Sequence, residues 1–343
     1  MLLTTALYIV DALCKRQSFV RLFITQDEHL LNSISNLLNY QNPIIFELSI
    51  EILIAFVDQP TELENFESFI PVLLVASSIV SHLRPVIILL LHKILQCEKT
   101  QQKFVDSNGL FLIYNTLLAP QDDELFSCLE ILLRLEKAKP VYLDAIVNTN
   151  ILQPLTEIIN KEDDMSLVER CLGIVSLLST SSFFPNICRS SGLFETCLEL
   201  IEYPYTKTST VVTLRAALLI IYRTTTNSLL VKSCTSLKLA SKLSNLIKNA
   251  NQFNPQVQMV VYGILANLIE SPEAQKDLLV TKVNTILYLI DLKTVIVEAQ
   301  PIITTALLVF ETLQVRDVKE EYTPKDIERI AEYNSQITRN KSS

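Results

Sequence analysis

The sequence predicts an all-α protein, a right-handed superhelix of about seven three-helix repeats that follow one partial repeat. Three observations predict this fold class. Glycine and tryptophan are scarce, similar passages recur at a period in the low forties, and each passage ends in a strongly apolar segment of helical length. A period of this length is typical of solenoids, in which each unit stacks only on its neighbours.

The composition favours a chain that is folded over almost its whole length. Its 343 residues include four glycines and no tryptophan, whereas glycine alone makes up about 7% of average proteins. Because glycine is so rare, few hairpin turns and few phosphate-binding loops are expected. Apolar residues make up 49% of the chain and charged residues 19%, so there is ample material for a core.

The repeat is clearest in two passages, KFVDSNGLFLIYNTLL from Lys103 and NICRSSGLFETCLELI from Asn186. Each carries a glycine at the same place, Gly109 and Gly192. The residue after the first glycine, Leu110, serves as the anchor of its repeat. Equivalent anchors follow along the chain at intervals of 40, 40, 41, 42, 46 and 44 residues: Leu30, Ile70, Leu110, Ile151, Leu193, Leu239 and Val283.

Each repeat is predicted to contain a short first helix, a break at the anchor, an amphipathic second helix, a polar loop and a longer third helix. Loops such as NKEDD and NANQFNP are rich in residues that start and stop helices. Third helices such as IIFELSIEILIAFV and VQMVVYGILANLI are apolar nearly all round, as expected for helices packed on two sides. Gly109 and Gly192 lie at the break, where the absence of a Cβ atom permits a tight bend.

The two ends of the chain differ from the repeats between them. Residues 1–17 align with a third helix that lacks the two helices before it, so this partial repeat is expected to have an apolar edge that a second copy, another chain or more of the same solenoid covers. The complete repeats extend over residues 18–316. Residues 317–343 are predicted to form a polar capping helix and tail, with Thr323 as N-cap and Pro324 at the first helical position.

This pattern of apolar spacing resembles the armadillo-repeat family. Units of that family have about 42 residues in three helices, with glycine at the corner between the first two. The third helix of the family tends to read Ala-Leu-x-x-Leu-x-Asn-Leu, and the nearest match here is VYGILANL, Val261 to Leu268. HEAT repeats, which have two helices per unit, are the alternative.

The resemblance implies that the third helices line a concave groove, in which the Asn of the pattern holds the main chain of an extended peptide. The positions that match this Asn are Ala12, Ala55, Lys93, Arg134, Leu177, Arg223, Asn267 and Glu311. Only Asn267 keeps the family's residue. Nuclear-import adaptors of this fold bind Lys and Arg side chains with tryptophans that this chain lacks, so binding of import signals is not expected.

The groove is predicted to be basic and apolar in its middle. Its candidate partner-binding residues are Leu89, Lys93, Arg134, Leu177, Arg215, Leu219, Arg223 and Asn267. Such a surface suits an acidic, partly hydrophobic peptide or helix, because arginine donates charge-assisted hydrogen bonds. At about 10 Å between neighbouring units, Arg134 and Arg223 are expected about 20 Å apart, which an extended segment covers with about six residues. The alternative is that each arginine pairs with a neighbouring acid such as Glu130 or Glu169.

The sequence contains no signature of catalysis, metal binding or cofactor binding. His29, His82 and His92 lack the Cys, Asp or Glu spacing of a metal site or a catalytic triad. No phosphate-binding glycine motif occurs. We interpret His82 and His92 as surface or inter-helix hydrogen-bonding groups, and we expect no enzyme activity, no metal and no cofactor.

Charge and hydropathy argue against two further classes of partner. The net charge is −8 and no run of Lys and Arg stands out, so no nucleic-acid surface is expected. The most apolar region, FIPVLLVASSIVSHLRPVIILLLHKIL, is interrupted by polar and charged residues, and no stretch reaches the about 20 apolar residues of a membrane-spanning helix. The seven cysteines are scattered and never spaced as CxxC, which indicates reduced thiols in a cytoplasmic protein, with the nucleus as the alternative.

The sequence therefore predicts a non-catalytic scaffold or adaptor that holds a segment of a protein partner in its groove. The alternative is a regulatory module for a globular partner, such as a small GTPase, an Hsp70-type chaperone or an actin-assembly protein, which armadillo-like modules in other proteins bind. Binding of a peptide should depend on the groove residues, whereas binding of a globular partner should depend on the ridge loops and a large contact area.

Overall fold

The structure is a computed structural model, and its described residues are helical almost throughout. They comprise 2–17, 27–38, 42–57, 63–79, 81–120, 122–202, 211–227, 230–231, 239–290 and 295–321. No strand occurs within these ranges, and helices occupy well over two thirds of them, which confirms the all-α prediction. The chain divides into two compact units, Met1–Leu193 and Phe194–Ser343, and each is described separately.

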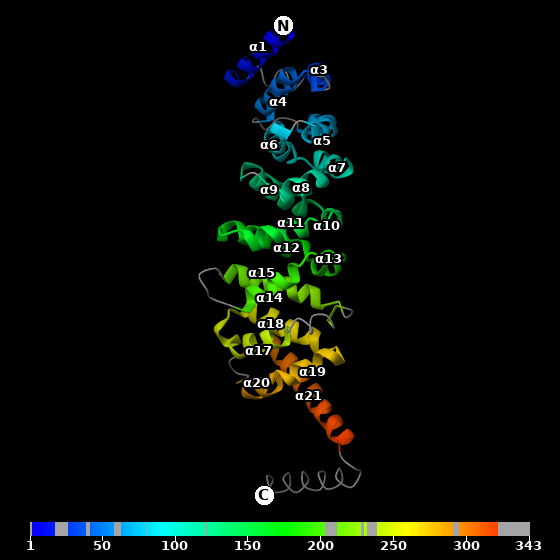
Figure 1. Cartoon of the computed structure of the whole chain (residues 1–343), viewed down its shortest axis with the longest axis vertical. Helices are drawn as coiled ribbons and strands as arrows, with labels where there is room; N and C mark the ends of the chain where they lie inside the picture. The colour runs from blue at the N-terminus through cyan, green and yellow to red at the C-terminus, as the bar shows by residue number, and fades with distance from the viewer. Residues whose placement is uncertain are drawn as a thin grey trace. The chain divides into compact units, whose positions relative to one another are not determined.

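The first unit consists of helices that repeat in sets of three (Figure 1). Its first helices are η1 (Leu63–Phe69), α7 (Glu98–Asp106), α10 (Pro140–Asn148) and α13 (Phe184–Ser190). Its second helices are α3 (Glu28–Leu38), α5 (Ile70–Ile79), α8 (Gly109–Leu118) and α11 (Leu152–Lys161). Its third helices are α1 (Leu2–Arg16), α4 (Pro43–Val57), α6 (Arg84–Ile94), α9 (Asp122–Ala138) and α12 (Met165–Leu178), and a short 3-10 turn, η2 (Ser81–Leu83), precedes α6. Each third helix packs against the next one along the chain.

The second unit continues the same order of helices. It contains α14 (Leu193–Glu202), α15 (Val211–Thr225), α17 (Leu239–Lys248), η3 (Ala250–Gln252), α18 (Pro255–Ile269), α19 (Pro272–Val280), α20 (Val283–Leu289), η5 (Val297–Ala299) and α21 (Gln300–Glu321). The third helix α18 packs between the third helices α15 and α21. The core of this unit, as of the first, therefore lies along the third helices.

The helix boundaries can be compared with the expected ones. All seven anchors lie at or next to the first turn of a second helix. The helix α1 corresponds to the partial repeat predicted for residues 1–17. The helix α21 continues through residues 317–321, which the sequence assigns to the capping segment. Residues 18–26 and 322–343, including Thr323 and Pro324, lie outside the described residues.

The third helices are buried because apolar residues cover nearly their whole circumference. On α4, for example, Ile52, Leu53 and Phe56 are fully buried. The polar loops before these helices supply N-caps, as predicted. The Asp164 carboxylate accepts a hydrogen bond from the backbone N–H of Ser166 at 2.9 Å, and a side-chain oxygen of Asn254 likewise caps α18.

The sequence period reappears in the polar contacts between repeats. The Lys99 ammonium binds the Glu64 carboxylate at 2.5 Å, and these residues are 35 positions apart. The Tyr142 hydroxyl donates to the side-chain oxygen of Gln102 at 3.1 Å across 40 positions. Such pairs join equivalent helices of neighbouring repeats, so polar side chains as well as the apolar core specify the stacking.

Only one of the two glycines at the corner between first and second helices takes the left-handed conformation of a tight bend. In the third repeat the left-handed residue is Asn108, with φ of 62°, and Gly109 follows it as the first residue of α8. A Cβ atom on Gly109 would lie 2.3 Å from the Phe104 ring, so this glycine makes room for an aromatic side chain. Gly192 does take the left-handed conformation, with φ of 77°. The two glycines thus occupy similar places for different physical reasons.

A stability prediction follows from the corner before α20. Lys282 adopts φ of 58°, although a left-handed conformation costs an ordinary residue about 1–2 kcal/mol. We expect Lys282→Gly to raise the free energy of unfolding by up to about 1 kcal/mol, since glycine removes the strain but is more flexible when unfolded. Urea denaturation measures the change. The control Thr281→Gly, at φ of −82°, should be destabilising, and a less stable Lys282→Gly variant would contradict the account.

The partial repeat gives a second stability prediction. On α1, Leu7 and Cys14 are buried, and α1 packs against α4. Removal of residues 1–16 should therefore expose the apolar flank of α4 and lower both stability and solubility. Thermal denaturation and the soluble yield of the shortened chain test this. If the shortened chain is as stable and soluble as the full chain, α1 is not needed to cover the first complete repeat.

Candidate functional site

The eight predicted groove residues lie on third helices and divide equally between the two units. Those of the first unit are Leu89, Lys93, Arg134 and Leu177, and those of the second are Arg215, Leu219, Arg223 and Asn267. In the first unit Leu89 on α6 and Leu177 on α12 are 41% and 42% exposed, which is high for leucine on helices with such buried cores. Lys93, one turn after Leu89, is half-buried.

Arg134 does not extend freely into solvent. Its guanidinium donates a hydrogen bond to the main-chain carbonyl of His92 and lies 3.2 Å from the Nε2 atom of the same residue. His92 belongs to the last turn of α6, where carbonyl groups have no partner within the helix. Burial lowers the pKa of His92 and the neighbouring Arg134 charge lowers it further, so the imidazole is neutral and Nε2 can accept from Arg134. The interpretation of His92 as an inter-helix hydrogen-bonding group agrees with this geometry.

Asn267 has the same role in the second unit. Its side-chain NH2 group donates to the carbonyl of Tyr222 at 3.2 Å and to the Thr225 hydroxyl at 3.0 Å, both in the last turns of α15. Arg134 and Asn267 occupy the same position of their repeats, and each reaches back to the end of the preceding third helix. Their donors thus hold neighbouring repeats together.

An ion pair that the sequence analysis did not predict joins the third helices α9 and α12. Arg170 on α12 binds the Glu130 carboxylate on α9, and its guanidinium carbon lies 4.6 Å from the centroid of the Phe126 ring. Phe126 is itself 53% exposed. The sequence offers Glu130 as a carboxylate partner for Arg134, whereas in the structure Glu130 pairs with Arg170. The separation of 40 residues, one repeat period, was the only signal in the sequence for this contact.

The second-unit cations are more available than Arg134. Arg215 and Arg223 on α15 are exposed, and Leu219 between them is half-buried. The Arg223 guanidinium lies 5.8 Å from the Tyr222 ring centroid. Neither arginine forms an ion pair with a carboxylate within the described ranges, so both keep an uncompensated positive charge on the third-helix face.

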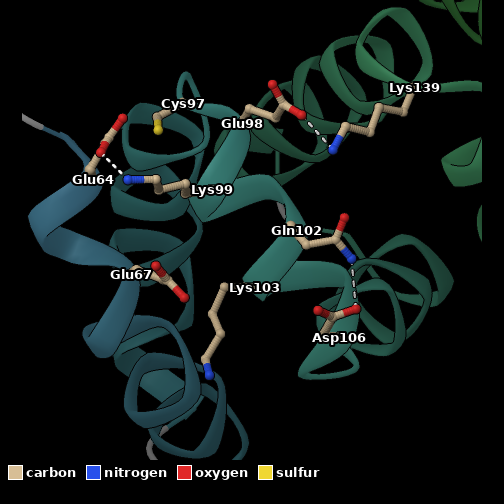
Figure 2. A pocket seen from close by; sticks show the side chains of 9 residues that line it. All are labelled: Glu64, Glu67, Cys97, Glu98, Lys99, Gln102, Lys103, Asp106 and Lys139. Carbon is tan, nitrogen blue, oxygen red and sulfur yellow. Dashed lines mark hydrogen bonds and ion pairs between the residues drawn. The ribbon is translucent and has the colours of Figure 1, made fainter.

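A separate depression of about 590 Å³ lies on the first-helix side of the first unit (Figure 2). Three lysines and four carboxylates line it together with Cys97 and Gln102. Lys99 pairs with Glu64, and Lys139 pairs with Glu98 at 2.5 Å. These opposite charges largely compensate one another across neighbouring repeats. We therefore interpret the residues that line the depression as an ion-pair network between repeats, and not as a ligand site.

The described part of the chain holds no cluster of three or more His, Cys, Asp and Glu side chains that could bind a metal ion. The described cysteines are all buried except Cys97. Burial raises the pKa of the Cys171 thiol to about 12, which makes it unreactive at neutral pH. No helix of the described ranges is both long and apolar enough to span a bilayer.

Comparison with solved structures identifies the fold. An engineered protein of the Northeast Structural Genomics Consortium superposes with a TM-score of 0.61 at 15% identity, over 89% of this chain and 74% of that one. Computationally designed armadillo repeat proteins for modular peptide recognition superpose with a TM-score of 0.56 at 13% identity, over 70% of this chain and 99% of that one. The chain has an armadillo-like repeat fold.

A third structure agrees with this assignment. A designed armadillo repeat protein in complex with the peptide (KR)4 superposes with a TM-score of 0.51 at 12% identity, over 82% of this chain and 99% of that one. No protein-family model matches the sequence, and no curated protein matches it. The similarity therefore concerns the armadillo-like architecture, which agrees with the three-helix repeats described above.

Proposed function

We propose that this armadillo-like chain is a non-catalytic binding scaffold, which holds an acidic, partly apolar segment of a partner protein against its third helices. The observation that carries the proposal lies within the second unit, where α15 presents Arg215 and Arg223 with the half-buried Leu219 between them. Leu89 and Leu177 are exposed in the first unit. Arg215 and Arg223 are exposed in the second, where no described carboxylate neutralises them.

The structural neighbours support a peptide as ligand, and the side chains of this chain suggest its charge. One set of neighbours was designed for modular peptide recognition, and another neighbour binds the basic peptide (KR)4. On α15 the third-helix face carries Arg215 and Arg223, and no described carboxylate pairs with either of them. Opposite charge on the ligand is therefore expected.

Arg134 is a poor residue for a test of ligand binding, because its hydrogen bonds also hold two repeats together. Because its guanidinium already binds the end of α6, reversing its charge would disturb the packing of two repeats as well as any ligand. Arg215 and Arg223 have no such structural role in the second unit. Replacement of these two residues should therefore change ligand binding without changing the stability of the fold.

The test uses a synthetic peptide with two glutamates about four residues apart and a leucine between them. This spacing fits the ~12 Å between Arg215 and Arg223, which lie two turns apart on α15. We expect it to bind in fluorescence anisotropy, and Arg215→Glu/Arg223→Glu should weaken binding by more than about tenfold and reduce its salt dependence. Circular dichroism should be unchanged, because both side chains are exposed.

Matched controls decide whether the effect is specific. Lys248→Glu changes an exposed charge on the second helix α17 of the same unit and should leave binding intact. A peptide with lysine in place of both glutamates, and (KR)4 itself, should bind poorly. If the acidic peptide binds no better than its lysine counterpart, or binds the double variant equally well, the third-helix face is not an acidic-peptide site.

A further inference from the structure

Two neighbouring second helices of the first unit present an uncharged apolar surface to solvent. Val75 and Ile79 on α5 are 59% and 75% exposed, and Phe111 and Leu118 on α8 are 61% and 43% exposed. Tyr114 stacks on Phe111 with ring centroids 6.2 Å apart. Since α5 and α8 contact one another, these five side chains form one surface, which we call the second-helix patch.

The patch is confined to two repeats. The preceding second helix, α3, exposes Asn32 and Asn36 beside one large apolar side chain, Leu30, and the following one, α11, exposes Asn160 and Lys161. Lys161 is paired with Glu157 at 3.0 Å. Neither α5 nor α8 contains a single charged residue. An exposed apolar surface between two helices with polar exposed residues is typical of a contact site.

We propose that the second-helix patch is the contact surface between two copies of this chain. The charge of the molecule favours this occupant. Each copy carries a net charge of −8, so two copies repel one another, and carboxylates at the contact would add to that cost. The helices α5 and α8 avoid this cost because they carry no charge, and an uncharged apolar surface is complementary to itself.

Two-fold symmetry fits the arrangement of the two helices. An axis between them places α5 of one copy against α8 of the other, and the reverse, so both patches are covered at once. The same axis brings α3 of one copy towards α11 of the other. Asn32 and Asn36 then face the Glu157–Lys161 pair, which is neutral as a unit.

The size of the patch predicts a weak association. The exposed fractions of Val75, Ile79, Phe111 and Leu118 together amount to fewer than three whole side chains, or about 500 Å² at roughly 200 Å² each. Two copies would bury about 1,000 Å² in total, which lies at the lower end for specific interfaces. The dimer should therefore dissociate on dilution, and the folded state of each copy does not depend on it.

Sedimentation velocity of the full chain over a concentration series, from about 1 to about 100 μM, tests the proposal. We expect the sedimentation coefficient to rise with concentration. Ile79→Glu and Phe111→Glu each place a carboxylate against apolar side chains of the other copy, where it loses its hydration, and should weaken association by more than about tenfold. Both positions are solvent-exposed in the single chain, so circular dichroism and thermal stability should remain unchanged.

The control is Ile9→Glu, which alters a residue on α1 that is 56% exposed at the amino-terminal edge. It should associate like the unaltered chain. Association that is lost in Ile9→Glu but kept in Phe111→Glu would place the contact at the amino-terminal edge and overturn the proposal. A chain that remains monomeric over the whole series would also overturn the proposal. The second-helix patch would then be a contact surface for a helix of a different protein. Each outcome is independent of peptide binding to the third helices.

Discussion

Arg84→Ala is expected to lower the free energy of unfolding by about 3–5 kcal/mol, the usual cost of breaking a buried ion pair. Arg84 on α6 donates from Nε and from a terminal nitrogen to the two oxygens of Glu124 on α9, at 2.7 and 2.9 Å. The Glu124 side chain is fully buried, and Arg84 is 25% exposed. Without the guanidinium, the carboxylate loses its compensating charge in surroundings that contain little water.

Chemical denaturation measures this loss, and two further variants identify its cause. Arg84→Met combined with Glu124→Leu should recover most of the stability, because an apolar pair of similar volume removes the buried charge altogether. Lys99→Ala breaks the exposed pair with Glu64 and should cost less than about 1 kcal/mol. Equal losses in Arg84→Ala and Lys99→Ala would show that burial does not strengthen the Arg84–Glu124 pair.

The repeat architecture was predictable because it depends on apolar spacing, which is visible in the sequence. The anchors Ile70, Leu110 and Leu193 lie within the first two residues of second helices. The corner was harder to predict. Asparagine also adopts the left-handed conformation, so Asn150 forms a corner that a search for glycine does not find, and Asn108 rather than the neighbouring Gly109 takes this conformation in the third repeat. The close approach of Phe104 to Gly109 depends on a side-chain position that no sequence pattern encodes.

The candidate site was only partly predictable. The helix faces of Leu89 and Leu177 followed from periodicity, and both are exposed. The use of Arg134 and Asn267 to bind main-chain carbonyls was not predictable, because those acceptors lie more than forty residues away and carry no side-chain signature. Glu130 similarly had two arginines within reach, and the packing of α9 on α12 selects Arg170.

The largest pH-dependent effect is expected at Glu136 on α9. Its side chain is buried, and neither carboxyl oxygen has a hydrogen-bond partner among the described residues. Burial raises the pKa of this carboxyl to about 9, whereas glutamate in an unfolded chain titrates near about 4.3. Between these values the folded chain holds a proton that the unfolded chain has released, so stability must fall as the pH rises.

The size of the effect follows from linkage, at up to about 1.4 kcal/mol per pH unit across this window. Glutamine at position 136 resembles the protonated carboxyl and cannot ionise. Glu136→Gln should therefore match the unaltered chain near pH 5 and exceed it by up to about 4 kcal/mol at pH 8. Denaturation curves at several pH values measure the difference. Glu157→Gln, on the exposed pair with Lys161, should show no such gain. Parallel stability curves for Glu136→Gln and the unaltered chain would mean that water or a moving neighbour reaches the carboxylate, so that it ionises in the folded state without cost.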